Sequence, residues 1–361
     1  MTPFEIDPDI RVARSLPPAA YGDPELFARM RERVFAPSWQ WCPEASETPR
    51  DGDVAPFTLL PGCLDEPLVI ARADGVARAL SNVCTHRGHP VVACAARGAS
   101  LRCRYHGRRF GLDGRFVSMP EFVGAQGFPS PDDDLAAVSL DRWGPLDFVS
   151  LRPEAPLRET LAQVDARVGS LSLERLARDP STDREFTFDA SWMLYCDNYL
   201  EGLHIPFVHP ALNAAIGYDD YRTELAPWGT LQLAFARDEG DVAFALPPGH
   251  PDEGARVAAF YAWVFPNLML NFYPWGLSLN VVQPLGPGRT RVLFRAWTWD
   301  ASLRARGAGA DLDAVEYEDE AVVIASQQGM RASLAKRGRY SPSKETGVHH
   351  FHRLLAERVR G

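Results

Sequence analysis

Residues 81–90 read SNVCTHRGHP, and residues 101–114 read LRCRYHGRRFGLDG. Each stretch contains a cysteine followed closely by a histidine, and sixteen residues separate the two pairs. The pairs are Cys84 with His86 and Cys103 with His106. Thiolates and imidazoles are good ligands for transition metals, and two loops that each carry such a pair form a single site when they meet. The pattern therefore predicts that these four residues bind one metal centre.

The ligand types indicate which metal centre this is. A zinc ribbon usually presents C-x-x-C knuckles, which the C-x-H spacing does not match. A Rieske [2Fe–2S] centre needs two thiolates on one iron and two imidazoles on the other, and one Cys and one His from each loop meet that need. Gly88 and Gly107 allow the loops to turn tightly. We expect buried thiols at the remaining cysteines, Cys42, Cys63, Cys94 and Cys196.

A second candidate metal site lies in residues 196–210, CDNYLEGLHIPFVHP. Glu201 precedes His204 by three residues, so the two share a face if the segment is helical. Pro206 disrupts the helical hydrogen bonds, and a bend there would turn His204 and His209 toward one metal. Two histidines and one carboxylate with open positions form the facial triad of non-haem Fe(II).

The carboxylate of that triad is expected on a C-terminal helix predicted over residues 313–337. At 100° per residue, Val323, Ser326 and Met330 fall within about 40° of Asp319. A carboxylate in an apolar stripe is costly unless it has a partner. We therefore predict Asp319 as the third iron ligand.

Three other acidic residues of the same helix are weaker candidates. Glu316 lies about 60° from Asp319 and is the alternative ligand, whereas Glu318 and Glu320 point about 100° to either side and should face solvent or the flanks. An ion pair between Asp319 and a buried arginine is the alternative that involves no metal.

The composition is that of an ordinary globular protein, with 46% hydrophobic and 24% charged residues over 361 positions, which allows two domains. Residues 23–35 predict a helix with Asp23 as its N-cap. Short β runs over 40–150 predict a small all-β module, and longer strands followed by the late helix predict an α+β second domain. The predicted strands are 54–60, 68–71, 77–82, 148–151, 185–188, 231–235, 258–264, 268–273, 277–282 and 291–297, with a hairpin turn at 286–290. The predicted divisions are 1–39, a helical segment packed on the second domain, 40–152 and 153–361.

The net charge of −9 argues against nucleic-acid binding, which needs a basic face. The sequence has no apolar run of the roughly 18 residues that a membrane span requires, and its acidic N-terminus has no secretory signal pattern. We therefore expect a cytoplasmic protein.

The combination of the two motifs resembles the catalytic α subunit of the Rieske non-haem iron oxygenases. The segments DNYLEGLHIPFVHP (197–210) and DEAVVIASQQG (319–329) are similar to the subgroup of choline, carnitine and glycine-betaine monooxygenases. The resemblance implies a Rieske domain joined to a helix-grip catalytic domain, a homotrimer, and a separate ferredoxin or reductase as electron donor. It also implies that Glu201 links His106 of one subunit to His204 of its neighbour.

The predicted function is that of a terminal oxygenase, which uses O2 and supplied electrons to hydroxylate or N-demethylate a small organic substrate. A quaternary ammonium compound and an aromatic ring remain alternatives, the latter making the chain a ring-hydroxylating dioxygenase subunit. An alternative function of another class is that of a non-catalytic Rieske electron carrier. That function would leave the second metal motif without a role. Aromatic residues of the second domain suit either substrate or the core: Trp228, Trp263, Phe265, Phe272, Tyr273 and Trp275.

Seven arginines and one acidic residue, Asp113, lie between Cys84 and Arg115. This basic cluster beside a redox centre predicts an acidic electron donor. Arg108 is the preferred contact because members of the family commonly have Trp at this place. Pairing of these arginines with a neighbouring subunit is the alternative.

Overall fold

A computed structural model describes residues 4–215, 221–237, 241–310 and 312–360. Contacts along the chain divide it into two compact units, which we name the small unit and the large unit. The small unit is Ala36–Leu157, and the large unit combines Met1–Phe35 with Arg158–Gly361. The predicted divisions at 39/40 and 152/153 lie four and five residues from the observed ones at 35/36 and 157/158. Of the N-terminal segment, residues 1–3 lie outside the described part.

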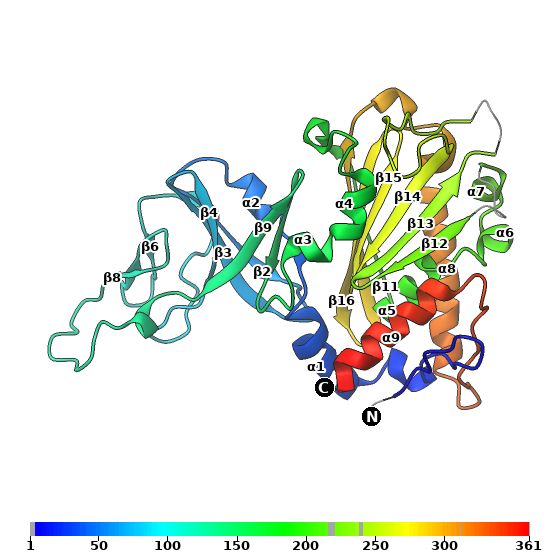
Figure 1. The fold of residues 1–361 in the computed structure, drawn as a ribbon. Helices are drawn as coiled ribbons and strands as arrows, with labels where there is room; N and C mark the ends of the chain where they lie inside the picture. The colour runs from blue at the N-terminus through cyan, green and yellow to red at the C-terminus, as the bar shows by residue number, and fades with distance from the viewer. Residues whose placement is uncertain (1–3, 216–220, 238–240, 311, 361) are drawn as a thin grey trace. The chain divides into compact units, whose positions relative to one another are not determined.

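The small unit is built from antiparallel strands (Figure 1). Seven of them form one sheet in the order β1-β10-β9-β4-β3-β2-β5, and three form a second sheet in the order β6-β7-β8. Asp74 and Gly75, both with positive φ, form the tight β3–β4 turn that an Asp-Gly pair favours. The elements are β1 Gln40–Trp41, α2 Glu44–Glu47, β2 Asp53–Leu59, β3 Glu66–Ala73, β4 Val76–Ser81, β5 Ala96–Arg97, β6 Leu101–Arg102, β7 Arg109–Phe110, β8 Phe116–Ser118, β9 Ala137–Trp143 and β10 Leu146–Ser150.

The large unit contains one seven-stranded antiparallel sheet in the order β11-β17-β16-β15-β14-β13-β12. Its central strands are apolar runs without alternation, which is typical of strands buried on both faces. The predicted hairpin joins β16 to β17. The strands are β11 Ala177–Phe188, β12 Arg222–Ala226, β13 Gly229–Phe235, β14 Val257–Val264, β15 Leu268–Tyr273, β16 Gly276–Gly286 and β17 Arg289–Thr298.

Helices complete this α+β unit, in agreement with the predicted fold class. The predicted first helix begins at its N-cap Asp23, whose side chain accepts the Leu26 N–H, and continues beyond α1 as one π-helical turn, Arg31–Phe35. The helices are α1 Pro24–Met30, α3 Leu157–Thr160, α4 Ala162–Val168, α5 Trp192–Tyr199, α6 Ile205–Val208, α7 Pro210–Ala215, α8 Leu312–Met330 and α9 Thr346–Arg360. Every helix in the described ranges is too short or too polar to cross a membrane.

The C-terminal region differs from the single helix predicted over 313–337. Helix α8 ends at Met330, and a separate helix α9 spans Thr346–Arg360. Gly338 and Pro342 lie between the two helices, and both residue types interrupt helical structure. The buried positions Val348, Phe351, Leu355 and Val359 recur at helical spacing, so the sequence did carry a signal for α9.

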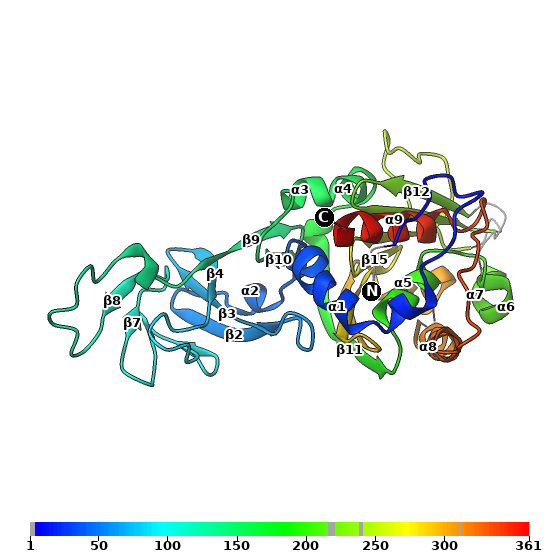
Figure 2. The same cartoon turned by 90° about the horizontal axis from the view of Figure 1, so that it is seen from below.

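Helix α9 packs against α5 and fixes its place under the sheet (Figures 1 and 2). The ring of Trp192 on α5 lies 5.0 Å from Phe35 and 5.7 Å from Phe351, and Phe351 lies 5.2 Å from Trp263 on β14, measured between ring centroids. Four buried aromatic side chains thus join the N-terminal segment, α5, the sheet and α9.

A buried polar network reinforces the same contact. The Asp197 carboxylate on α5 accepts a hydrogen bond from the Tyr21 hydroxyl at 2.6 Å and contacts His352 Nε2 at 2.8 Å. His352 Nδ1 in turn lies 2.7 Å from the Tyr340 hydroxyl. Because buried polar groups need partners, this network favours one orientation of α5.

Gly229 supplies a test of the sheet. A Cβ atom at this position would lie 1.9 Å from the Trp263 backbone oxygen, so Gly229→Ala should reduce the free energy of unfolding by about 1–3 kcal/mol. Gly329→Ala is the matched control, because no atom lies within 4 Å of the added carbon on α8 and alanine favours helix. Chemical denaturation measures both variants, and equal stability of the two would contradict the close packing at Gly229.

Candidate functional site

The two cysteine–histidine loops of the small unit have the same backbone turn. The N–H of Gly88 donates to the oxygen of Cys84 at 2.9 Å, and the N–H of Gly107 donates to the oxygen of Cys103 at 3.1 Å. Both glycines have positive φ, +69° and +77°, which only glycine adopts at little cost. Each turn therefore begins at a cluster cysteine and ends four residues later at a glycine, with the histidine between them.

The loops bring all four predicted cluster residues together. Cys84 and Cys103 belong to the apolar core between the sheets, while His86 and His106 lie toward the surface with their Nδ1 atoms 3.1 Å apart. Burial raises the pKa of the Cys84 thiol, and the adjacent Cys103 raises it further. Burial and the neighbouring His106 lower the pKa of His86. Two thiols inside and two imidazoles outside match the ligand division of a Rieske cluster.

The prediction for Arg108 is wrong. This side chain is only 2% exposed, so it cannot be the preferred contact of an electron donor. Its guanidinium donates to Asp133 Oδ1 at 2.6 Å and lies 4.9 Å from the centre of the Phe116 ring. Asp133 also joins the other loop, because its backbone oxygen accepts the Thr85 hydroxyl. Arg108 thus ties the two cluster loops to the segment around residue 133.

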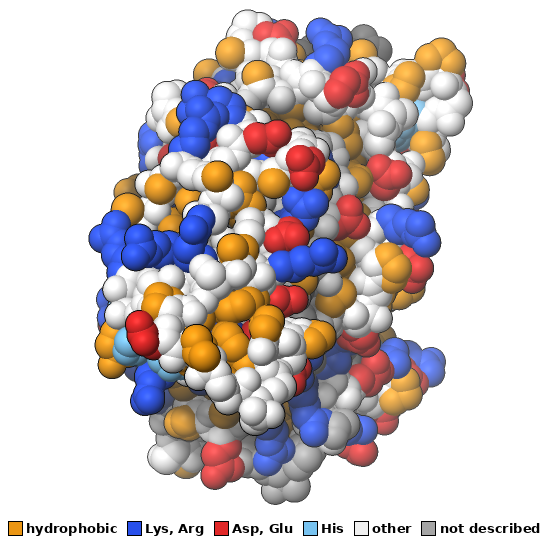
Figure 3. Space-filling model, turned by 90° about the vertical axis from the view of Figure 1, so that its left-hand side faces the viewer, with side chains coloured by type: hydrophobic (Ala, Val, Ile, Leu, Met, Phe, Trp, Pro, Cys, Tyr) orange, Lys and Arg blue, Asp and Glu red, His pale blue; other side chains and the backbone are white. Residues whose placement is uncertain are grey.

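The other six arginines of the basic cluster are exposed. Figure 3 faces the side on which β6 and β8 lie in Figure 1, and Lys and Arg side chains are spread over it beside surface histidines. Arg97 pairs with Asp53 and Arg115 with Asp113. Cys94 is also exposed here, which corrects the buried thiol predicted for it; Cys42, Cys63 and Cys196 are buried as predicted.

In the large unit, Glu201 and His204 are in contact, but they do not share a helix as predicted. Helix α5 ends at Tyr199, and the Glu201 carboxylate accepts the backbone N–H groups of Leu203 and His204 in the loop before α6. Glu201 Oε1 lies 2.7 Å from His204 Nδ1. The carboxylate therefore holds both the loop and the imidazole.

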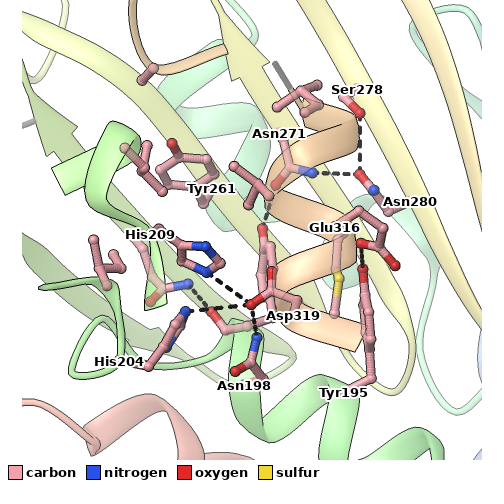
Figure 4. A pocket seen from close by; sticks show the side chains of 18 of the residues that line it. Tyr195, Asn198, His204, His209, Tyr261, Asn271, Ser278, Asn280, Glu316 and Asp319 are labelled. Atoms are coloured by element: carbon pink, nitrogen blue, oxygen red, sulfur yellow. Dashed lines mark hydrogen bonds and ion pairs between the residues drawn. The ribbon is translucent and has the colours of Figure 1, made fainter. Parts of the chain in front are cut away.

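Asp319 is the point at which the second site converges (Figure 4). Its Oδ1 lies 2.9 Å from His209 Nε2 and 3.7 Å from His204 Nε2, and it accepts the Asn198 amide at 2.5 Å. Potential ligand atoms of the two histidines and Asp319 all lie within 4.8 Å of one another. His204 and His209 flank the short helix α6, with Pro206 inside it. This donor set fits the 2-His-1-carboxylate iron site.

Glu316, the alternative ligand, lies elsewhere. Its Oε2 accepts the Tyr195 hydroxyl at 2.6 Å, and it is not part of the histidine group. Burial raises the pKa of Glu316 to about 8. The buried face of α8 is formed by Glu316, Val323 and Gln327 with Asp319 at its edge, so the predicted stripe through Met330 was displaced. The helix ends at Met330, which leaves the last part of that stripe without a helix.

The sequence placed Glu318 toward solvent or the flanks and did not connect it with His209. Its Oε2 lies 2.6 Å from His209 Nδ1, although the side chain is about half-buried. Burial opposes protonation of His209, but contacts with Asp319 and Glu318 outweigh it and raise the pKa of the imidazole. Both histidines therefore have a glutamate at Nδ1 and Asp319 at Nε2. The only feature of the sequence that could have indicated this contact is that Glu318 directly precedes Asp319.

A cavity of about 120 Å³ adjoins this group and is lined by residues of α5, α8 and the sheet. Most of the aromatic residues singled out in the sequence are not part of it: only Tyr273 lines the cavity, and Trp263 and Phe272 belong to the core. The rest of the aromatic lining comes from Phe294 and four other tyrosines, namely Tyr195, Tyr199, Tyr221 and Tyr261. In the sequence, neither the spacing of these residues nor the residues around them marked them as cavity residues.

Comparisons with known proteins identify both domains of the chain. Residues 38–129 match the family described as Rieske [2Fe-2S] domain, and residues 172–361 match that described as ring hydroxylating alpha subunit (catalytic domain). The chloroplastic choline monooxygenase of Arabidopsis thaliana is 30% identical over 99% of this chain and 86% of its own. The carnitine monooxygenase oxygenase subunit of Escherichia coli K12 is 27% identical over 96% of this chain and 94% of its own.

A solved structure shows the same fold. A crystal structure of the quaternary ammonium Rieske monooxygenase CntA superimposes with a TM-score of 0.75, at 21% identity, over 97% of this chain and 96% of that one. The match to a catalytic domain favours an oxygenase over a mere electron carrier. The chain therefore belongs to the Rieske non-haem iron oxygenases, as a catalytic α subunit that uses a Rieske [2Fe–2S] cluster, a non-haem iron and O2 to oxidise its substrate.

Proposed function

We propose that this chain is the terminal oxygenase of a reductase-dependent system that oxidises a quaternary ammonium compound. The observation that carries the proposal is the tyrosine-lined cavity beside the His204, His209 and Asp319 group. Aromatic faces attract a quaternary ammonium, which has no hydrogen to donate. The overall reaction is R–H + O2 + 2e⁻ + 2H⁺ → R–OH + H2O, and hydroxylation next to nitrogen leads to N-dealkylation. The names of the choline and carnitine relatives point the same way.

The proposed ligands form two separate metal centres. Cys84, His86, Cys103 and His106 would bind the [2Fe–2S] cluster, and His204, His209 and Asp319 would bind the mononuclear iron. When bound, that iron supplies the redox chemistry that activates O2. Glu201 would accept a hydrogen bond from the Nδ1–H group of His204, and Glu318 would accept one from that of His209. The Nε2 atoms of both histidines are then left to bind the metal.

Electron transfer between subunits completes the proposal. His106 of one subunit would lie next to Glu201 of its neighbour in a homotrimer, which places the cluster near the iron of another chain. Exposed apolar side chains next to both groups support such an interface, since Tyr105 is 57% and Phe207 83% exposed. The cytoplasm is the proposed location, because none of the six cysteines, all of which are described, forms a disulfide.

Metal analysis of ligand variants tests the function. Asp319→Ala should lose one iron per chain and all activity while keeping the cluster absorbance, and Cys84→Ser should lose the cluster absorbance. Glu316→Gln is the control, because it changes a neighbouring carboxylate of α8 without touching the histidines. Retention of the mononuclear iron in Asp319→Ala and its loss in Glu316→Gln would show that the wrong carboxylate was chosen.

Glu318 is tested by comparing two substitutions. Glu318→Ala should weaken binding of the mononuclear iron by about 10–100-fold, because His209 loses the acceptor that orients it, while Glu318→Gln keeps an oxygen there and should weaken it less. Asp313→Ala, a change at an exposed acid of the same helix, is the control. Titration of the iron-free protein with Fe(II) measures the affinities. Wild-type affinity in Glu318→Ala would exclude this positioning role.

The electron donor is proposed to be an acidic ferredoxin or reductase domain. Arg87, Arg102 and Arg104 are exposed, and no ion-pair partner is seen for them among the described residues. The rate of cluster reduction by the donor should fall between about 0.01 and 0.15 M salt, as the Debye length shrinks from roughly 30 to 8 Å. Arg104→Glu should lower the rate at low salt, and Arg33→Glu in the large unit should not. A rate independent of salt would contradict electrostatic docking.

A further inference from the structure

The cavity beside the iron-binding group offers favourable contacts to a cation and few to a carboxylate. We propose that the substrate is a quaternary ammonium cation that carries no carboxylate, such as an amino alcohol, and that zwitterionic betaines are poor substrates. The inference rests on the proposed function and narrows its substrate class. The relatives leave this choice open, since choline is a cation and carnitine a zwitterion.

The charges around the cavity are one-sided. The Glu201 and Asp319 carboxylates line it together with Glu316, whose pKa burial raises to about 8, and among the described lining residues none is a lysine or an arginine. The two lining histidines face Asp319 with their Nε2 atoms, where they would bind iron. A substrate carboxylate would therefore lose its hydration without gaining a cationic partner from a side chain, which is costly.

The neutral hydrogen-bond donors near the cavity are mostly occupied. The Tyr199 hydroxyl donates to the Asn271 amide oxygen at 2.7 Å, and the Asn271 amide donates to the Asn280 amide oxygen at 2.5 Å. The Ser278 hydroxyl lies 3.3 Å from the same Asn280 oxygen (Figure 4). Gln232 donates to the backbone oxygen of Tyr199 at 2.9 Å. These four donors are already paired with acceptors of the protein.

The same holds on the helix side of the cavity. The Tyr195 hydroxyl donates to Glu316 and the Asn198 amide donates to Asp319. For the amide nitrogen of Asn280, no acceptor is seen in the described ranges of the chain. The phenols Tyr221, Tyr261 and Tyr273 line the cavity as well. These neutral donors and the Asn280 amide can serve a hydroxyl group, but they give a carboxylate no cationic partner.

The aromatic lining suits a cation. Tyr261 lies near Tyr273 and Tyr221, with ring centroids 5.8 and 6.4 Å apart. Burial raises the pKa of all three phenols, so they remain neutral and present electron-rich faces.

Three arginines close to the cavity do not supply the missing cation. They line a neighbouring cavity of about 420 Å³, which shares Ser278, Phe294 and Leu312 with the first. Each is ion-paired: Arg184 with Asp313 at 3.3 Å, Arg295 with Glu185 at 2.5 Å and Arg304 with Asp179 at 2.6 Å. A carboxylate that reached them would have to displace an existing partner.

A substrate panel tests the inference on the iron-loaded protein with its electron donor. The panel contains choline, tetramethylammonium, glycine betaine, carnitine and 3,3-dimethylbutan-1-ol, the uncharged analogue of choline. The expected result is that kcat/KM for choline exceeds that for glycine betaine and for carnitine by at least about 100-fold, because their carboxylates stay unpaired. Anaerobic calorimetry should show the same order in Kd, with weak binding of the uncharged analogue.

A charge introduced into the cavity gives the second arm. Asn280→Lys should shift the ratio of choline to glycine betaine by at least about tenfold toward glycine betaine, whereas Asn280→Met, which removes the amide without adding charge, should not. The wild-type panel decides the matter even if Asn280→Lys does not fold. A ratio below about 100-fold in the wild type would overturn this inference and leave the proposed function standing. Binding and turnover of none of the ammonium compounds would overturn the proposed function as well.

Discussion

A single carboxylate oxygen, Asp319 Oδ1, joins the elements of the catalytic unit. It accepts the Asn198 amide from the end of α5, contacts His209 after α6 and lies near His204 before it. A carboxylate at the edge of a buried helix face needs such partners, because an unpaired charge there costs several kcal/mol. The position of α8 therefore fixes the histidine loop, and a displacement of either would separate the proposed ligands.

Packing far from the site holds that geometry in place. The Trp192 and Phe351 contact and the hydrogen bonds of Asp197 with Tyr21 and His352 fix α5 against α9. Helix α5 then presents Tyr195, Asn198 and Tyr199 to the cavity from one side. The aromatic packing and the hydrogen-bond network thus position the cavity residues of α5 without contacting them directly.

The two centres differ in the surroundings of their histidines. Those of the cluster loops lie toward the surface, where an imidazole can meet another chain, while His209 is only 1% exposed and is held at both ring nitrogens. In the small unit, the ion pair between the buried Arg108 and Asp133 connects both cluster loops. In the large unit, no lysine or arginine lines the cavity among the described residues, which agrees with the cationic substrate that we propose.

The sequence alone predicted both metal motifs, the strand-rich first module, the α+β second unit and Asp319 as a candidate ligand, because ligand chemistry and periodicity are local properties of the chain. It failed where residues distant in sequence decide the outcome. The sequence placed Glu318 toward solvent or the flanks, but it contacts His209, which lies 109 residues earlier. It placed Arg108 at a docking surface, but the Asp133 carboxylate and the Phe128 ring bury it. The tyrosines of the cavity come from α5, a loop and two strands, and only the tertiary structure, by closing the sheet over α5 and α8, made them one surface.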